Sequence, residues 1–289
     1  MPSLQATRRR IGSVKNTQKI TKAMKLVSAS KLRRAQERIM AARPYADQMA
    51  ALLGQLSRRV SVNAHPLLQP RDGNAVELAI ISSDRGLCGS FNTQLFRQTM
   101  ELARRLEAEG KAVTLTTIGR KARDFFRRRP WPVTKSWVQL PLQFEQAKTI
   151  AQELIGAFLS GERHEIRLLF TEFRSVASQR PVNRVLLPIG ESTETADAAP
   201  ATEMGSYLYE PEEEGLLAEL LPRSIAVQLF RALLESAASE QGARMMAMDS
   251  AARNAGQMIN RLTLIYNKTR QAAITKELMD IVGGAEALR

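Results

Sequence analysis

The C-terminal stretch of this 289-residue chain, from Pro222 onward, carries a regular seam that a second helix has to cover. Its steps alternate between three and four residues, which is the heptad period of a coiled coil. The seam positions are Met245, Met248, Ala252, Ala255, Ile259, Leu262, Tyr266, Thr269 and Ala273. The pattern shifts by one residue near Thr269 and resumes at Ile274, Leu278, Ile281, Ala285 and Leu288. Such a shift locally unwinds a supercoil. Pro222 suits a first helical turn, and an unbroken helix from there would be about 100 Å long.

A matching seam lies near the other end of the chain. Its positions are Leu32, Ala35, Ile39, Ala42, Ala46, Met49, Leu53, Leu56 and Val60. We expect an apolar face at Ile11, Val14, Ile20, Met24 and Val27 to continue it toward the N-terminus. Pro44 removes one helical hydrogen bond, but the seam keeps its phase across it, which indicates a bend and not a stop. The two terminal helices are therefore predicted to form one antiparallel coiled coil. The alternative is two separate amphipathic helices on an ordinary core.

Positive charge is concentrated on the N-terminal helix. The formal net charge is +13, and residues 1–60 carry 14 Lys and Arg against only Glu37 and Asp47. We therefore expect an acidic partner for this helix. The single cysteine rules out an internal disulfide and makes a reducing compartment the default. No apolar run is long enough to span a bilayer, and no apolar segment typical of a signal peptide follows the basic N-terminus.

The middle of the chain alternates strand and helix patterns, which predicts a Rossmann-like α/β domain with a mainly parallel sheet. The expected strands are 75–82, 112–118, 165–173 and 183–189, the last two as neighbours, and residues 137–140 are expected to be extended. The expected helices are 92–110, 120–129 and 144–160. Residues 191–203 are acidic and low in apolar content, which is typical of a linker, and 207–210 are expected to form a short strand. The predicted domains are 1–62, 63–211 and 212–289.

The sequence offers no constellation of residues for catalysis. The loop Ser83–Gly89 follows the first predicted strand, where a glycine-bearing loop can hold phosphate. Its spacing fits neither GxGxxG nor GxxxxGK[ST], so we interpret the glycines as a tight turn. Cys88 has no histidine near it in sequence, and one Cys with two His cannot complete a zinc site. We therefore predict no catalytic residue, no cofactor and no metal.

Two functions fit a basic coiled coil attached to a small α/β domain. One is a mechanical or interaction subunit whose paired helices enter an acidic cavity of a partner. The alternative is a basic coiled-coil nucleic-acid-binding protein that lays its N-terminal helix along phosphates. A groove-reading basic region is expected to lack a seam of its own, whereas this one carries a seam matched by the C-terminus, which favours the first function. A Rossmann-type enzyme is disfavoured because the chain lacks a phosphate loop.

Three segments of the chain resemble the gamma subunit of the F-type ATP synthase. They are ITKAMKLVSASK at 20–31, SDRGLCGSFN at 83–92 and ITKELMDIVGGA at 274–285, and the last matches that family's C-terminal signature. The resemblance covers essentially the whole chain and points to a bacterial subunit. It implies a rotor shaft, one copy per complex, at the cytoplasmic face of the cell membrane. The shaft turns inside a ring of alpha and beta subunits, while the epsilon subunit and the membrane c ring lie at its foot. It also implies that this chain is not an enzyme by itself and binds no nucleic acid.

The resemblance also implies which residues contact partners. Contacts with the beta subunits are expected at Met24, Lys25, Arg244, Arg270, Gln271 and Thr275. Contacts with the c ring are expected at Tyr207 and Glu210. Many members of the family carry Glu where this chain has Lys25, so the chain departs from the family's pattern at one expected contact.

Overall fold

The computed structural model describes residues 3–59, 65–190 and 213–286 and divides into two compact units. The first unit consists of residues 1–29 and 244–289, and the second of residues 30–243. Two long helices, α1 (Leu4–Arg59) and α5 (Glu213–Glu286), contribute residues to both units. The expected domain boundaries near 62 and 211, the linker 191–203 and the short strand 207–210 lie outside the described residues.

Both long helices contain a proline, and the two behave differently from each other. Pro44 lies inside α1 and does not end it, as predicted. Pro222 was expected in the first turn of α5, and this prediction was wrong because the helix begins nine residues earlier, at Glu213. The added turns bury Leu217 and Leu221, each 1% exposed, in the core of the second unit. Burial of two leucines is worth about 3–6 kcal/mol, which offsets the roughly 3 kcal/mol that an interior proline costs a helix.

The second unit is built on a five-stranded sheet with the order β3-β2-β1-β4-β5. The strands are β1 (Ala75–Ile81), β2 (Ala112–Ile118), β3 (Val133–Trp137), β4 (Glu165–Phe173) and β5 (Gln179–Leu187). The helices between them are α2 (Phe91–Ala108), α3 (Arg120–Phe126) and α4 (Phe144–Leu159). The first four strands pair in parallel, and β5 is antiparallel to its neighbour β4. The predicted α/β domain with a mainly parallel sheet is confirmed.

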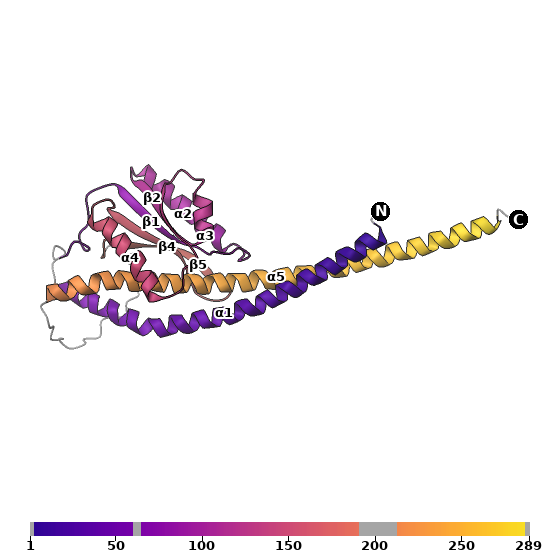
Figure 1. Ribbon diagram of the computed structural model, residues 1–289, viewed down its shortest axis with the longest axis horizontal. Helices are drawn as coiled ribbons and strands as arrows, with labels where there is room; N and C mark the ends of the chain where they lie inside the picture. Colours follow the sequence, from indigo (N-terminus) through magenta and orange to yellow (C-terminus); the bar gives the residue numbers. More distant parts are fainter. Residues whose placement is uncertain (1–2, 60–64, 191–212, 287–289) are drawn as a thin grey trace. The chain divides into compact units, whose positions relative to one another are not determined.

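Each face of the sheet is covered by its own helices, as Figure 1 shows. Alternate residues of β1 point to opposite faces, as the two-residue period of a strand requires. Val76, Leu78 and Ile80 join the core beneath α2 and α3. Ala79 and Ile81 join the core beneath α4 and the first part of α5. Residues 213–243 of α5 therefore form a layer of the α/β domain and also belong to one of the two paired helices.

The two edge strands lie at positions that the sequence pattern missed. β3 occupies 133–137 rather than 137–140, because its central residues are polar and exposed and give no apolar signal. β5 begins at Gln179 rather than 183, although Pro181 lies within it. An edge strand tolerates a proline because one side of it donates no ladder hydrogen bonds.

A close approach of two loops fixes the end of β2. Gly119 follows the strand with φ 106°, a left-handed conformation that favours glycine. A Cβ atom at this position would lie 2.3 Å from the carbonyl oxygen of Ser82. The Ser82 hydroxyl accepts a hydrogen bond from the N–H of Ala122 at 2.9 Å. The first turn of α3 is therefore held directly against the end of β1.

Candidate functional site

The carboxyl end of the parallel sheet, where Rossmann-type proteins bind ligands, is tied together by the chain's own side chains. Asp84 accepts hydrogen bonds from the N–H of Arg120 at 2.9 Å and of Gln139 at 3.1 Å. Cys88 is 2% exposed and lies 3.3 Å from the Nδ2 atom of Asn92. The loop turns at Leu87 and Gly89, both with positive φ, as the tight-turn interpretation predicted. This edge is a structural junction of three loops.

The candidate functional surface lies instead on the paired helices of the first unit. The Nζ atom of Lys25 lies 2.6 Å from Oδ1 of Asp249. Gln18 is one heptad earlier in α1, and its Nε2 atom would lie 3.0 Å from a Cβ on Gly256, one heptad later in α5. Gln18 also donates to the carbonyl oxygen of Ala252 at 3.2 Å. Because numbers rise along one helix as they fall along the other, the pair is antiparallel, as predicted.

The seam of α1 in this unit runs through polar residues that the sequence analysis did not select. Ile20 and Val27 were expected in the seam and are instead 60% and 55% exposed, so this part of the prediction was wrong. Thr7, Thr21 and Ser28 are buried in their place. These positions continue the heptad phase of Leu32 and Ala35 without a break. Thr7, Thr21 and Ser28 could have been predicted by continuing the seven-residue period of Leu32 and Ala35 toward the N-terminus, whether the residues are polar or apolar.

Small side chains explain why threonine and serine occupy this seam. They face a part of α5 that is itself lined by small residues, namely Ala252, Ala255 and Gly256. Their hydroxyl groups are satisfied locally, since Thr21 Oγ1 donates to the carbonyl oxygen of Thr17 at 3.0 Å. The seam is therefore narrow, and Ile20, Leu26 and Val27 are left on the outside between exposed lysines. We call these three apolar residues with Lys19 and Lys22 the outer face of α1.

The C-terminal part of α5 extends past the start of α1. The register that places Lys25 opposite Asp249 places Leu4, three heptads earlier, opposite Arg270. The first seam is confirmed up to this level, since Met248, Ala252 and Ala255 are buried and the positions from Ile259 to Ala273 are half-buried. The resumed seam is exposed. The exposed fractions are 49% for Ile274, 58% for Leu278, 68% for Met279, 68% for Ile281 and 58% for Val282. These five residues are the tip face.

The prediction that the resumed seam continues the pairing within the chain is wrong for its described members. Ile274, Leu278 and Ile281 lie beyond the level at which α1 begins, and no helix in the described part of the chain covers them. The side chains of Ala285 and Leu288 are outside the described residues. A run of exposed apolar side chains along one helix is typical of a surface that binds another protein.

The predicted partner-contact residues fall into three groups. Arg270, Gln271 and Thr275 are exposed at the base of the tip face, and the Thr275 hydroxyl donates to the carbonyl oxygen of Gln271 at 2.9 Å. Met24 is half-buried beside the outer face of α1, and Lys25 is paired with Asp249. The third group consists of Arg244, Tyr207 and Glu210. Arg244 is only 8% exposed, and Tyr207 and Glu210 are outside the described residues.

The Lys25–Asp249 pair should make the helix pairing sensitive to acid. The hydrogen bond from Lys25, aided by the charge of Arg253, holds the pKa of Asp249 below its ordinary value of 3.8. A carboxyl whose pKa is depressed on folding stabilises the fold above its unfolded pKa, and this contribution is lost as the pH falls through the folded pKa. We expect Lys25→Gln to lower the denaturant midpoint of the full chain at pH 7 but to match the wild type at pH 2. Lys22→Gln, on the exposed outer face, is the control and should change neither. An effect of Lys25→Gln that persists at pH 2 would contradict this.

In the second unit the seam of α1 is buried, and hydrogen bonds fix α5 to the sheet. Leu32, Ala35 and Met49 of the predicted α1 seam are buried, which confirms that seam in its described part. The hydroxyl groups of Ser236 and Ser239 in α5 donate to the carbonyl oxygens of Ile81 at 3.4 Å and Thr171 at 3.0 Å. These two serines were not predicted, because they carry no apolar signal. Their three-residue spacing on the buried face of α5 was the available signal.

Within residues 3–59, 65–190 and 213–286 no helix is both long enough and apolar enough to cross a membrane. Within the same ranges no three His, Cys, Asp or Glu side chains lie close enough together to hold a metal ion.

Comparisons with known proteins agree on one family. Residues 3–288 match a protein-family model described as ATP synthase. The chain is 50% identical over 294 residues to the ATP synthase gamma chain of Anaeromyxobacter sp. (strain Fw109-5), and 51% identical over 296 residues to that of Acidiphilium cryptum (strain JF-5). Both alignments cover all of this chain and all of the relative. The relatives named here are bacterial gamma chains, and none of the comparisons supports the nucleic-acid-binding alternative.

Solved structures show the same fold. The chain is similar to one in the central stalk and c ring of the Tetrahymena thermophila mitochondrial ATP synthase, with a TM-score of 0.61 and 26% identity. That alignment covers 80% of this chain and 99% of the other. A chain of the Euglena gracilis mitochondrial enzyme gives a TM-score of 0.70 at 19% identity, covering 99% and 94% of the two chains.

Proposed function

The chain belongs to the ATP synthase gamma-chain family and forms the central rotor shaft of that enzyme, and we propose that the outer face of α1 and the tip face of α5 are the surfaces that couple rotation to ATP chemistry. One observation carries this proposal: the paired helices of the first unit leave two apolar surfaces exposed that nothing in the described chain covers. The proposed partners are the alpha and beta subunits of the catalytic head, with one copy of this chain per complex.

Electrostatic attraction supports the docking of α1. The exposed lysines of its outer face lie on α1, and residues 1–60 of the chain carry a net charge of +12. Such a surface attracts an acidic loop, steers its approach and sets its orientation. Met24 lies beside this face and is a proposed contact. Lys25 is also proposed, but its charge is shared with Asp249, so it contributes less to an acidic partner than Lys19 or Lys22.

Shape and exposure support the docking of α5. The tip face is apolar, and Arg270, Gln271 and Thr275 offer polar groups at its base. We propose that the tip turns inside the ring of alpha and beta subunits and that these three residues contact the beta subunits. Arg244 stays on the proposed contact surface, although its low exposure requires its side chain to move first.

Rotation then acts through differences in contact energy. A shaft with two unlike faces presents a different surface to each catalytic subunit, so each conformation of that subunit is favoured at one angle. Linkage makes the effect reciprocal: a change in nucleotide state also favours one angle of the shaft. In this proposal ATP is made or hydrolysed on the beta subunits, and this chain is not catalytic by itself.

The foot of the shaft is proposed to meet the epsilon subunit and the membrane c ring at the cytoplasmic face of the bacterial membrane. The Tetrahymena thermophila structure, described as a central stalk with its c ring, supports this placement by similarity. Tyr207 and Glu210 are the proposed c-ring contacts.

Charge reversal on the outer face of α1 tests the proposal. We expect Lys19→Glu combined with Lys22→Glu to weaken assembly with the alpha and beta subunits by about tenfold or more at low salt, because two exposed attractions become repulsions. The defect should shrink at high salt, since exposed charges are screened within about 10 Å at 0.1 M. Assembly is measured as the apparent affinity of the full chain for the catalytic head.

The matched control reverses two charges elsewhere. Arg127→Glu combined with Arg128→Glu changes the net charge equally at exposed positions in the α/β domain. It should leave assembly near the wild-type level at both salt concentrations. Equal defects in the two double variants, or a defect of α1 that ignores salt, would sink the electrostatic docking role.

A further inference from the structure

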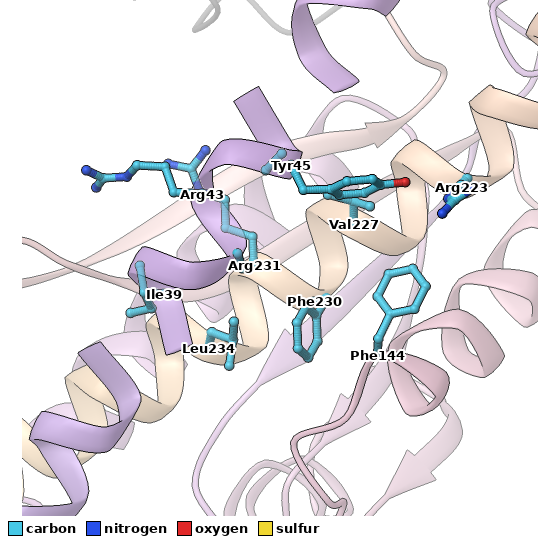
Figure 2. A pocket seen from close by; sticks show the side chains of 11 residues that line it. Ile39, Arg43, Tyr45, Phe144, Arg223, Val227, Phe230, Arg231 and Leu234 are labelled. Atoms are coloured by element: carbon cyan, nitrogen blue, oxygen red, sulfur yellow. The ribbon is translucent and has the colours of Figure 1, made fainter. Parts of the chain in front are cut away.

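A hollow of about 260 Å³ lies within the second unit, where α1 and α5 diverge beside the start of α4 (Figure 2). Its walls are formed mainly by Ile39 and Ala46 of α1 and by Val227, Phe230 and Leu234 of α5. Phe144 of α4 closes one side, and its ring meets that of Phe230 edge-on at 5.7 Å. Ile39, Ala46, Phe144 and Phe230 are only half-buried, so the hollow is open to solvent.

Three arginines and a tyrosine surround this apolar lining. Figure 2 shows the ring of Tyr45 between Arg43 and Arg223, which lie at opposite ends of the hollow. The guanidinium of Arg223 stacks on the Tyr45 ring at 5.4 Å. Arg231 donates through Nε to Oε1 of Glu235 at 2.9 Å and is thereby paired.

The charge at the rim is therefore not balanced from within. None of the eleven lining residues is acidic. In the described part of the chain no carboxylate forms an ion pair with Arg43 or Arg223, whereas Arg231 already has Glu235. The two remaining guanidinium groups each present a planar set of N–H donors that fits a carboxylate in a bidentate manner.

We propose that this hollow is a binding site for a small amphipathic carboxylate, with its alkyl chain between α1 and α5 and its head group on Arg43 or Arg223. The size selects the ligand class. Pockets for drug-sized ligands begin at about 300 Å³, so this one suits a shorter molecule such as a medium-chain fatty carboxylate. Apolar surface supplies the affinity, and the arginines distinguish an anion from a neutral or cationic head group. This site is separate from the two faces proposed for coupling.

The test uses the full chain and octanoate as the probe, with binding followed by calorimetry and by the rise in melting temperature. We expect saturable binding of one octanoate, because a ligand that binds only the folded chain stabilises it. Octylammonium should bind at least tenfold more weakly, and octanol should fall between the two. Arg43→Gln combined with Arg223→Gln should weaken octanoate at least tenfold and leave octanol unchanged.

Two further variants keep the proposal open to contradiction. Arg38→Gln removes an exposed charge from the same helix outside the hollow and should bind octanoate like the wild type. Ala46→Leu fills the hollow and should abolish binding of octanoate and octanol alike. Equal binding of octanoate and octylammonium, or normal binding by the double arginine variant, would overturn the assignment. So would loss of octanoate binding in the assembled complex, because that result would place the hollow in a subunit interface.

Discussion

A reversible covalent bond between position 270 and the catalytic head is expected to stop multi-site ATP hydrolysis almost completely. The variant is Arg270→Cys in the assembled complex, with a second cysteine introduced on the inner surface of the head. Arg270 is exposed at the level where α1 begins, so a thiol there can reach a partner. A shaft fixed at one angle can no longer present its unlike faces to the catalytic subunits in turn. Hydrolysis is measured after oxidation and again after reduction, which should restore it.

The native thiol does not complicate this experiment. Cys88 is the chain's single cysteine and is 2% exposed, so it is shielded from the oxidant. The control complex carries Arg270→Cys without the second cysteine and should keep its activity after oxidation. Hydrolysis at the full rate with nearly all of the chain cross-linked would rule out a turning shaft at this position.

The substitution Leu229→Ala is expected to lower the free energy of unfolding by about 2–5 kcal/mol, the usual cost of a buried leucine truncated to alanine. Leu229 is fully buried in α5 and packs in the core that α5 shares with α4 and the sheet. Since whole domains are stable by only about 5–15 kcal/mol, this is a large fraction of the total. The measurement is the denaturant midpoint of the full chain, followed by circular dichroism and by the fluorescence of Trp131 and Trp137.

The matched control makes the same substitution in the same helix. Leu264 lies in α5 within the first unit and is 71% exposed. Leu264→Ala should change stability by no more than about 0.5 kcal/mol, as expected for a surface position. If the two variants lose similar stability, then α5 does not serve as a layer of the α/β domain, and the two-unit description of the chain would have to be revised.

Features with a strong local pattern could be predicted from the sequence. The seam from Leu32 to Leu53 is made of apolar or small residues in strict heptads, and the buried strands β1, β2 and β4 are short apolar runs. The antiparallel direction follows because the chain has to return from the middle domain to its start. In each of these cases, local preference and final packing agree.

Other features depend on the partner element and gave no readable pattern. The register is seen in the pairing of Lys25 with Asp249, and a heptad repeat by itself allows several such registers. The exposure of Ile20 follows from small residues on α5 that take polar Thr21 into the seam. The length of the tip face depends on where α1 begins, not on any residue within α5. The hollow beside Tyr45 depends on the divergence of two helices, and no motif marks it.

The pairing of the two chain ends has a consequence for biosynthesis. Residues 1–29 are synthesised before their helical partner, which starts at Arg244. At ordinary rates of elongation the interval is roughly 10–40 s. During that time the seam of the nascent N-terminal helix has no partner helix to cover it, while the sheet between the two segments can already fold. Newly made chains should therefore depend on a chaperone, or on early capture by another subunit, more than their modest size suggests.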